Sequence, residues 1–171
     1  MRVPERRPAL GPAEATLVSG ARTATLATRR PDGRPRLVPI CYVAAADPDP
    51  AGRLVLYTPL DEKPKRSTDP RRLGRVADLL VLPDATLLVE RWDEDWARLA
   101  WVRLDGRATL LEPEPDERVE HAAAVAALRA KYPQYAGQRL EDRPVIRIVV
   151  DRVTAWSAAD DDGRRARSAG G

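Results

Sequence analysis

Apolar and polar residues alternate with a period of two in the first part of the chain, which is typical of β-strands half-buried in a sheet. The first such run covers residues 21–28, the second 35–45 and the third 53–57. Pro31, Asp32 and Gly33 form a tight-turn signal between the first two runs, which predicts a hairpin. Three strands joined by short turns indicate an antiparallel meander rather than a βαβ crossover unit.

Further along, helical and strand patterns alternate. Residues 12–19 predict a short helix, and residues 70–80 a helix with apolar side chains at helical spacing. Strands are expected over 86–90, 96–111 and 143–156, the long middle one bending near Asp105-Gly106, and a helix over 116–131. Runs of neighbouring strands favour a closed or nearly closed barrel, so the fold class is mainly β with peripheral helices.

The length and composition bound the possibilities. The 171 residues suit one domain, expected over 12–157, with a flexible N-terminus over 1–11 and a disordered tail over 158–171. One cysteine and one histidine argue against a disulfide framework and a metal site. The chain shows no transmembrane run and no secretory signal, which predicts a cytoplasmic protein. A net charge of +3, with both signs mixed, argues against nucleic acid as the partner.

Candidate chemistry gathers after the third predicted strand. Lys63, Lys65 and Arg66 follow it within a few residues, with Ser67 and Thr68 beside them. The chain has only three lysines among its 29 basic residues, and two of them lie here. Clustered cations and hydroxyls before a helix N-terminus suit an anionic ligand, while a solvated basic loop is the alternative.

The usual catalytic motifs are absent. There is no G-x-G-x-x-G, no P-loop and no G-x-S-x-G elbow. His121 lies in an alanine-rich helix and is interpreted as a surface residue, and Cys41 as a small buried one. No catalytic residue is assigned. An anion-binding loop without a protein-borne acid, base or nucleophile favours chemistry carried by a bound cofactor.

Taken together, the chain over about residues 12–157 resembles the pyridoxamine 5′-phosphate oxidase-like split-barrel family, and within it the actinobacterial branch that uses the deazaflavin coenzyme F420. Four segments carry this resemblance: A-T-L-A-T with P-D-G-R-P-R-L-V-P-I, L-Y-T with D-E-K-P-K-R, R-R-L, and W-D-E-D-W-A-R-L-A-W-V-R-L-D-G-R-A. The loop D-E-K-P-K departs from the Y-T-N-x-x-S-R-K pattern of the flavin-using oxidases. This departure favours the deazaflavin over flavin mononucleotide (FMN), which remains the alternative.

The resemblance implies a six-stranded antiparallel split β-barrel and a homodimer with two cofactor sites between the subunits. It implies phosphate-gripping roles for Lys63, Lys65 and Arg66. The other cofactor-binding positions that it implies are Tyr57 and Thr58 at a strand end, Val38, Pro39 and Ile40 on a strand facing the ring, and Arg71, for which a plain helix-surface cation is the alternative. Trp92, Trp96 and Trp101 would line a cavity or the dimer interface, or else belong to the core.

The activity that the resemblance implies is hydride transfer between reduced coenzyme F420 and a small organic acceptor such as an enone, a quinone or a tetrapyrrole. An FMN-dependent oxidase or reductase of the same fold is one alternative. A non-catalytic carrier of a deazaflavin or flavin is another, because the same residues would serve it.

Overall fold

The structure is a computed structural model that describes residues 6–7, 9–61 and 69–159. Its strands are β1 (Arg6–Arg7), β2 (Ala24–Arg29), β3 (Pro35–Ile40), β4 (Val43–Ala44), β5 (Val55–Pro59), β6 (Asp84–Arg91), β7 (Ala100–Leu111) and β8 (Val145–Ser157). Its α-helices are α1 (Pro12–Gly20), α2 (Gly74–Val81) and α3 (Arg118–Lys131). Short 3-10 helices are η1 (Pro70–Arg72), η2 (Trp96–Arg98), η3 (Pro133–Tyr135) and η4 (Leu140–Asp142).

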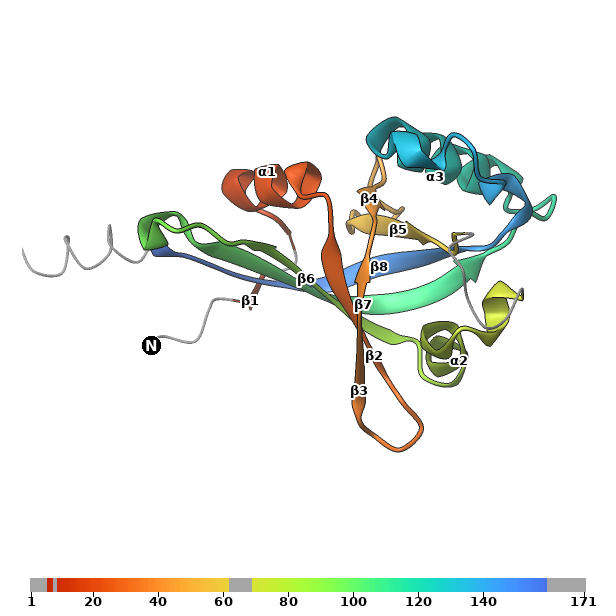
Figure 1. The fold of residues 1–171 in the computed structure, drawn as a ribbon, viewed down its shortest axis with the longest axis horizontal. Coiled ribbons are helices and arrows are strands. Elements are labelled where there is room, and N and C mark those ends of the chain that lie inside the picture. The colour runs from red at the N-terminus through yellow and green to blue at the C-terminus, as the bar shows by residue number, and fades with distance from the viewer. Residues whose placement is uncertain (1–5, 8, 62–68, 160–171) are drawn as a thin grey trace, which may run out of the picture.

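All strands belong to one antiparallel sheet, with the order β3-β2-β6-β7-β8-β5-β4 and β1 paired to β8 (Figure 1). The predicted mainly β split barrel is confirmed. Six strands of five or more residues form it, and the described residues add two strands, β1 and β4, of two residues each.

The two ends of the strand order meet in the chain. β3 ends at Ile40 and β4 begins at Val43, so only Cys41 and Tyr42 separate the first strand of the sheet from the last. The sheet must therefore curl until its two edges approach one another, which leaves a barrel that is split at this point. We call residues 41–42 the closure.

The closure corrects two predictions. The predicted second strand over 35–45 is broken at the closure, with β3 paired to β2 and β4 paired to β5. The predicted three-strand meander holds only in part: β5 pairs with β4, the end of the predicted second strand, but the closure separates β4 from β3, and β5 also pairs with β8. The hairpin of β2 and β3 is confirmed, and Gly33 in its turn has a φ of 82°, a conformation that glycine adopts readily.

Tyr132 holds the closure. Its hydroxyl oxygen accepts a hydrogen bond from the Tyr42 N–H at 3.0 Å and lies 2.7 Å from the Tyr42 carbonyl oxygen and 3.0 Å from that of Arg22, so its proton has two acceptors within reach. The Tyr42 hydroxyl donates to the Val18 carbonyl in α1 at 2.5 Å. The N–H and carbonyl of Tyr42, which bond to neither β2 nor β5, thus still have hydrogen-bond partners although they are buried.

Two apolar clusters fill the fold. The larger lies inside the barrel and includes Leu26, Leu56 and Leu104, all fully buried. The smaller lies between the sheet and α3, which covers β4, β5 and β8 (Figure 1), and it includes Tyr57 and Leu128. Adjacent residues of β5 therefore face different clusters, as strand alternation requires.

Several element boundaries differ from those predicted. The long strand begins at Ala100 because residues 96–98 form η2, whose first turn is capped by the Asp95 carboxylate. The predicted helix over 70–80 is η1 followed by α2. The bend at Asp105/Gly106 is confirmed as a bulge, and a Cβ at Gly106 would lie 2.1 Å from the Val149 carbonyl oxygen, which excludes larger residues there.

We predict that Tyr132→Phe lowers the free energy of unfolding by about 1–3 kcal/mol, because it leaves buried backbone groups at the closure without a partner. Urea unfolding measures the loss. Tyr135→Phe is the matched control, since this tyrosine is equally buried but its hydroxyl contacts the side chains of Asp61, at 3.5 Å, and Cys41 instead of the backbone groups of the closure. Equal losses in the two variants would contradict the role given to Tyr132.

Candidate functional site at the barrel closure

The predicted site residues fall into two groups. Lys63, Lys65 and Arg66 lie outside the described residues, so their assignment stays a prediction. Five of the others lie around the closure: Val38, Pro39 and Ile40 at the end of β3, and Tyr57 and Thr58 in β5. Arg71 lies in η1.

The register of the sheet brings the ends of β3 and β5 to the closure. Val43 pairs with Tyr57 immediately after the closure, and Ile40 precedes it directly. β3 is also a terminal strand of the sheet order, so its outer edge has no strand partner within the described part of the chain. Such an edge offers backbone N–H and C=O groups to a ligand, which suits the predicted role of residues 38–40.

Tyr57 and Thr58 point to opposite faces of β5. Thr58 lies on the barrel side with Leu56, whereas Tyr57 packs beneath α3, where its hydroxyl donates to Glu120 Oε1 at 2.6 Å. Arg147 Nε donates to the same oxygen at 2.7 Å. Burial, then the bond to Glu120, raises the pKa of Tyr57. Tyr57 thus ties β5 to α3, and of the two Thr58 is the one whose side chain faces the barrel.

A buried carboxylate fixes α2 to the hairpin. Asp78 in α2 is 2% exposed and accepts hydrogen bonds from Arg36 Nε at 2.6 Å and from the Thr28 hydroxyl at 2.8 Å. The bond from Arg36 lowers the pKa of Asp78, although burial opposes the shift. The Arg36 guanidinium also lies against Gly74, where a Cβ would come within 2.6 Å of it. The basic segment 63–66 precedes α2 in the sequence. The network of Asp78, Arg36 and Thr28 therefore fixes the position of the helix that follows this segment.

The chain enters that basic segment from a buried position. Asp61 is 6% exposed, Tyr135 donates to it at 3.5 Å, and Arg143 donates to the Leu60 carbonyl at 3.4 Å. Arg75 in α2 lies within electrostatic reach of Asp61, and burial lowers the pKa of Arg75 while Asp61 opposes that shift. Leu60 and Asp61, the last described residues before the segment, are therefore tied to η3, α2 and the approach to β8.

Arg75 differs from Arg36 in its hydrogen bonding. Its Nε is buried and has no hydrogen-bond partner among the described residues. A buried donor left unpaired costs free energy unless something else accepts its proton, and a phosphate or carboxylate oxygen does so well. Nothing in the local sequence distinguishes Arg75 from Arg71 and Arg72. Only the packed structure shows that its Nε is buried, with Asp61 and Tyr135 within electrostatic reach.

Arg71 lies at the surface. Its guanidinium donates to Glu112 Oε2 at 2.8 Å, and its side chain is 52% exposed. This geometry agrees with the alternative that Arg71 is a helix-surface cation.

The prediction that His121 is a surface residue is wrong. His121 is 4% exposed, and its Nε2 lies 2.8 Å from the Arg143 carbonyl oxygen. A carbonyl only accepts, so Nε2 carries the proton and His121 ties α3 to the approach to β8. Cys41, at the closure, is partly exposed instead of fully buried. Among the described residues, no group of three or more histidine, cysteine, aspartate or glutamate side chains is arranged to hold a metal ion.

Trp92 and Trp96 do not belong to the core of the single chain. Their side chains are 75% and 72% exposed, around the connection between β6 and β7. Trp101 is partly buried and pairs across the sheet with Trp156 of β8. All four tryptophans of the chain thus lie near one end of these strands.

The family model described as pyridoxamine 5′-phosphate oxidase matches residues 10–157, which covers the barrel and all three helices. The chain belongs to this family. No curated protein matches the chain in sequence. Within the described residues, no helix has the length and apolar character needed to cross a membrane.

Solved structures share the fold. A conserved hypothetical protein from Mycobacterium tuberculosis is 25% identical, with a TM-score of 0.62, and the match covers 88% of this chain and 86% of that one. A FAD-binding protein from Mesorhizobium loti is 18% identical with a TM-score of 0.60, over 85% of this chain and 94% of that one. The heme storage protein HutZ from Vibrio cholerae is 14% identical with a TM-score of 0.60, over 86% and 94%. The last two similarities concern the fold alone.

We predict that Asp78→Asn lowers the free energy of unfolding at neutral pH by about 1.5–3 kcal/mol, because it removes the charge that Arg36 pairs with. The folded-state pKa of Asp78 lies below its usual 3.8, so its contribution is present above about pH 4 and is lost as the pH falls through the folded value. Unfolding curves from pH 7 to pH 3 measure the difference between native protein and variant, which should shrink towards acid.

Asp84→Asn is the control for this experiment. Asp84 is exposed, and its nearest cation, Arg107, lies 3.8 Å away. A loss in Asp84→Asn as large as that in Asp78→Asn, or a difference that does not depend on pH, would refute the buried ion pair as the tie between α2 and β3.

Proposed function

We propose that this protein is an oxidoreductase that uses coenzyme F420 and transfers a hydride between the reduced deazaflavin and a small organic acceptor of the enone, quinone or tetrapyrrole type. The observation that carries the proposal is the closure. The unpaired edge of β3 and the end of β5 lie at the closure. The segment with Lys63 and Lys65 follows β5 in the sequence, and α2 after it carries Arg75, whose buried Nε has no hydrogen-bond partner among the described residues.

The residues present fit an anionic cofactor. Lys63, Lys65 and Arg66 would hold its phosphate with compact charges, and Arg75 would add a buried donor next to them. The backbone of residues 38–40 would flank the ring, and Thr58 would lie beside the ring or its sugar-alcohol chain. The cofactor supplies the hydride chemistry when bound.

The protein's own part is binding, orientation and exclusion of water. The apolar barrel interior gives the ring a dry wall, and the network of Asp78, Arg36 and Thr28 keeps α2 in register with β3. Holding donor and acceptor in a reactive geometry is itself a large contribution to rate. The preference for coenzyme F420 over FMN rests on the loop Asp61-Glu62-Lys63-Pro64-Lys65, which departs from the pattern of flavin-using oxidases.

A homodimer with cofactor sites between its subunits belongs to the same proposal. Trp92 and Trp96 support it, because two large aromatic side chains more than 70% exposed are costly to leave in water. In the dimer they would lie at the subunit interface or against the cofactor's open face.

A carrier function is the second candidate, and one observation favours it. Two groups near the closure that could act as acid or base are already engaged: Tyr57 with Glu120, and Asp61 with Tyr135. Turnover separates the two functions. An enzyme oxidises reduced coenzyme F420 with an added quinone or enone faster than free solution does, whereas a carrier holds the reduced cofactor unchanged.

We predict that the double variant Lys63→Ala, Lys65→Ala binds coenzyme F420 at least about 100-fold more weakly than the native protein, since each charge-assisted bond contributes about 1.5–3 kcal/mol. Fluorescence titration measures the affinity. The control removes two exposed cations elsewhere, Arg107→Ala and Arg139→Ala, whose side chains are 61% and 81% exposed. Equal affinity in both double variants would remove Lys63 and Lys65 from the site.

A further inference from the structure

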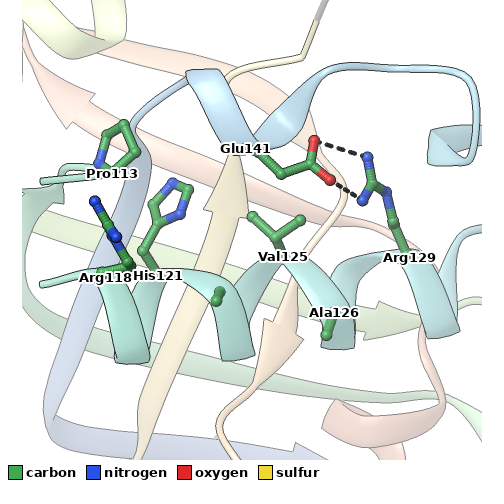
Figure 2. Close-up of a pocket in the computed structure, with 8 residues that line it drawn as sticks. Pro113, Arg118, His121, Val125, Ala126, Arg129 and Glu141 are labelled. Atoms are coloured by element: carbon green, nitrogen blue, oxygen red, sulfur yellow. Dashed lines mark hydrogen bonds and ion pairs between the residues drawn. The ribbon is translucent and has the colours of Figure 1, made fainter. Parts of the chain in front are cut away.

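A pocket of about 380 Å³ lies on the side of α3 that faces the chain leading into β8 (Figure 2). Its volume falls in the range of small-molecule sites, about 300–1,000 Å³. None of its lining residues belongs to β3, β5 or α2, so it is separate from the closure.

Two hydrogen-bonded struts hold the pocket open. At one strut His121 Nε2 donates to the Arg143 carbonyl at 2.8 Å. At the other Arg129 binds the Glu141 carboxylate and donates to the Gln138 carbonyl at 2.8 Å. The two struts leave α3 eight residues apart, which is about 12 Å along the helix axis. The segment over 138–143 is thereby tied to α3 at both ends of the pocket, and Leu140 between them packs into the core cluster that includes Val125 and Leu128.

The floor between the struts is apolar. Val125 lies midway on the same helical face as His121 and Arg129 and is 3% exposed, with Ala126 beside it (Figure 2). Ala122 also lines the pocket. Val125 also belongs to the core cluster beneath α3, so the floor is rigid. A compact apolar group can lie on it without displacing a bound side chain.

The charges of the lining do not cancel. Glu141 neutralises Arg129, and the pKa of Glu141 is lowered by that bond. Arg118 lines the opposite end, one helical turn before His121, and within the described residues no hydrogen bond or ion pair engages its guanidinium. The pocket therefore carries one uncompensated positive charge at one end of an apolar floor.

From this arrangement we infer that the pocket binds a small organic monoanion, a carboxylate on a compact apolar body, with the carboxylate on Arg118 and the body over Val125. The planar guanidinium of Arg118 matches a carboxylate in a two-point contact. Glu141 at the far end disfavours a second negative charge, so dicarboxylates of similar length bind more weakly. This inference is independent of the cofactor proposed for the closure.

Benzoate is the probe, and amide chemical-shift mapping of the full-length native chain is the measurement. Benzoate is expected to bind with a Kd of about 1 mM, in keeping with its few heavy atoms, and to shift amides of α3 and of residues 138–143. Neutral benzamide, which has the same shape, is expected to bind at least about tenfold more weakly. Absence of saturable benzoate shifts, or equal binding of benzamide, would overturn the inference.

Three variants of exposed residues test the site without endangering the fold. Arg118→Gln is expected to weaken benzoate binding about tenfold or more, and Ala122→Leu to abolish it by filling the floor. Arg139→Gln, an exposed arginine outside the lining, is the charge-matched control and should bind as the native chain does. Native-like affinity in Ala122→Leu would show that benzoate binds elsewhere, and an equal loss in Arg139→Gln would show a response to net charge alone.

Discussion

The closure at Cys41 and Tyr42 is the constraint on which the rest of the structure depends. The chain must leave the ladder with β2 and enter the ladder with β5 within two residues, so the backbone of Tyr42 bonds to neither strand. The single hydroxyl of Tyr132 lies within hydrogen-bond distance of both the N–H and the carbonyl of Tyr42. The Tyr42 hydroxyl donates to the Val18 carbonyl in α1. The Lys131 ammonium lies 4.4 Å above the Tyr42 ring. Tyr42 is thus the residue at which α1, α3 and both halves of the barrel meet.

This constraint produces the site. A sheet that curls onto itself without pairing its edges leaves β3, within the described part of the chain, with an unpaired edge beside the end of β5. The basic segment follows β5 in the sequence and precedes α2. Two arginines, Arg36 and Arg75, differ in their hydrogen-bond partners. Arg36 has Asp78 as a full partner, whereas Arg75 keeps a buried donor without one among the described residues. The first arrangement suits a structural tie and the second a ligand contact, which is why Arg36 is assigned to positioning and Arg75 to binding.

Local features of the fold could be predicted from the sequence. The hairpin of β2 and β3 follows from strand alternation and from the Pro31-Asp32-Gly33 turn, and the bulge at Gly106 from a glycine within an apolar run. The pairing of β5 with β8 could not, because neighbouring strands in sequence usually pair, and the break between β3 and β4 could not because the closure carries no turn residue. His121 was misplaced for a related reason: whether a helix face is buried depends on what covers it, here the segment that leads into β8.

The most direct test of the central claim, that the closure is an anion-binding cofactor site of the deazaflavin type, is a parallel fluorescence titration of the purified protein with coenzyme F420 and with FMN. The account predicts saturable, tight binding of coenzyme F420 and much weaker binding of FMN. Preference for FMN would assign the protein to the flavin-using branch of its family. Lys63 and Lys65 would then indicate only general phosphate binding. Binding of neither would contradict the account and leave only the fold.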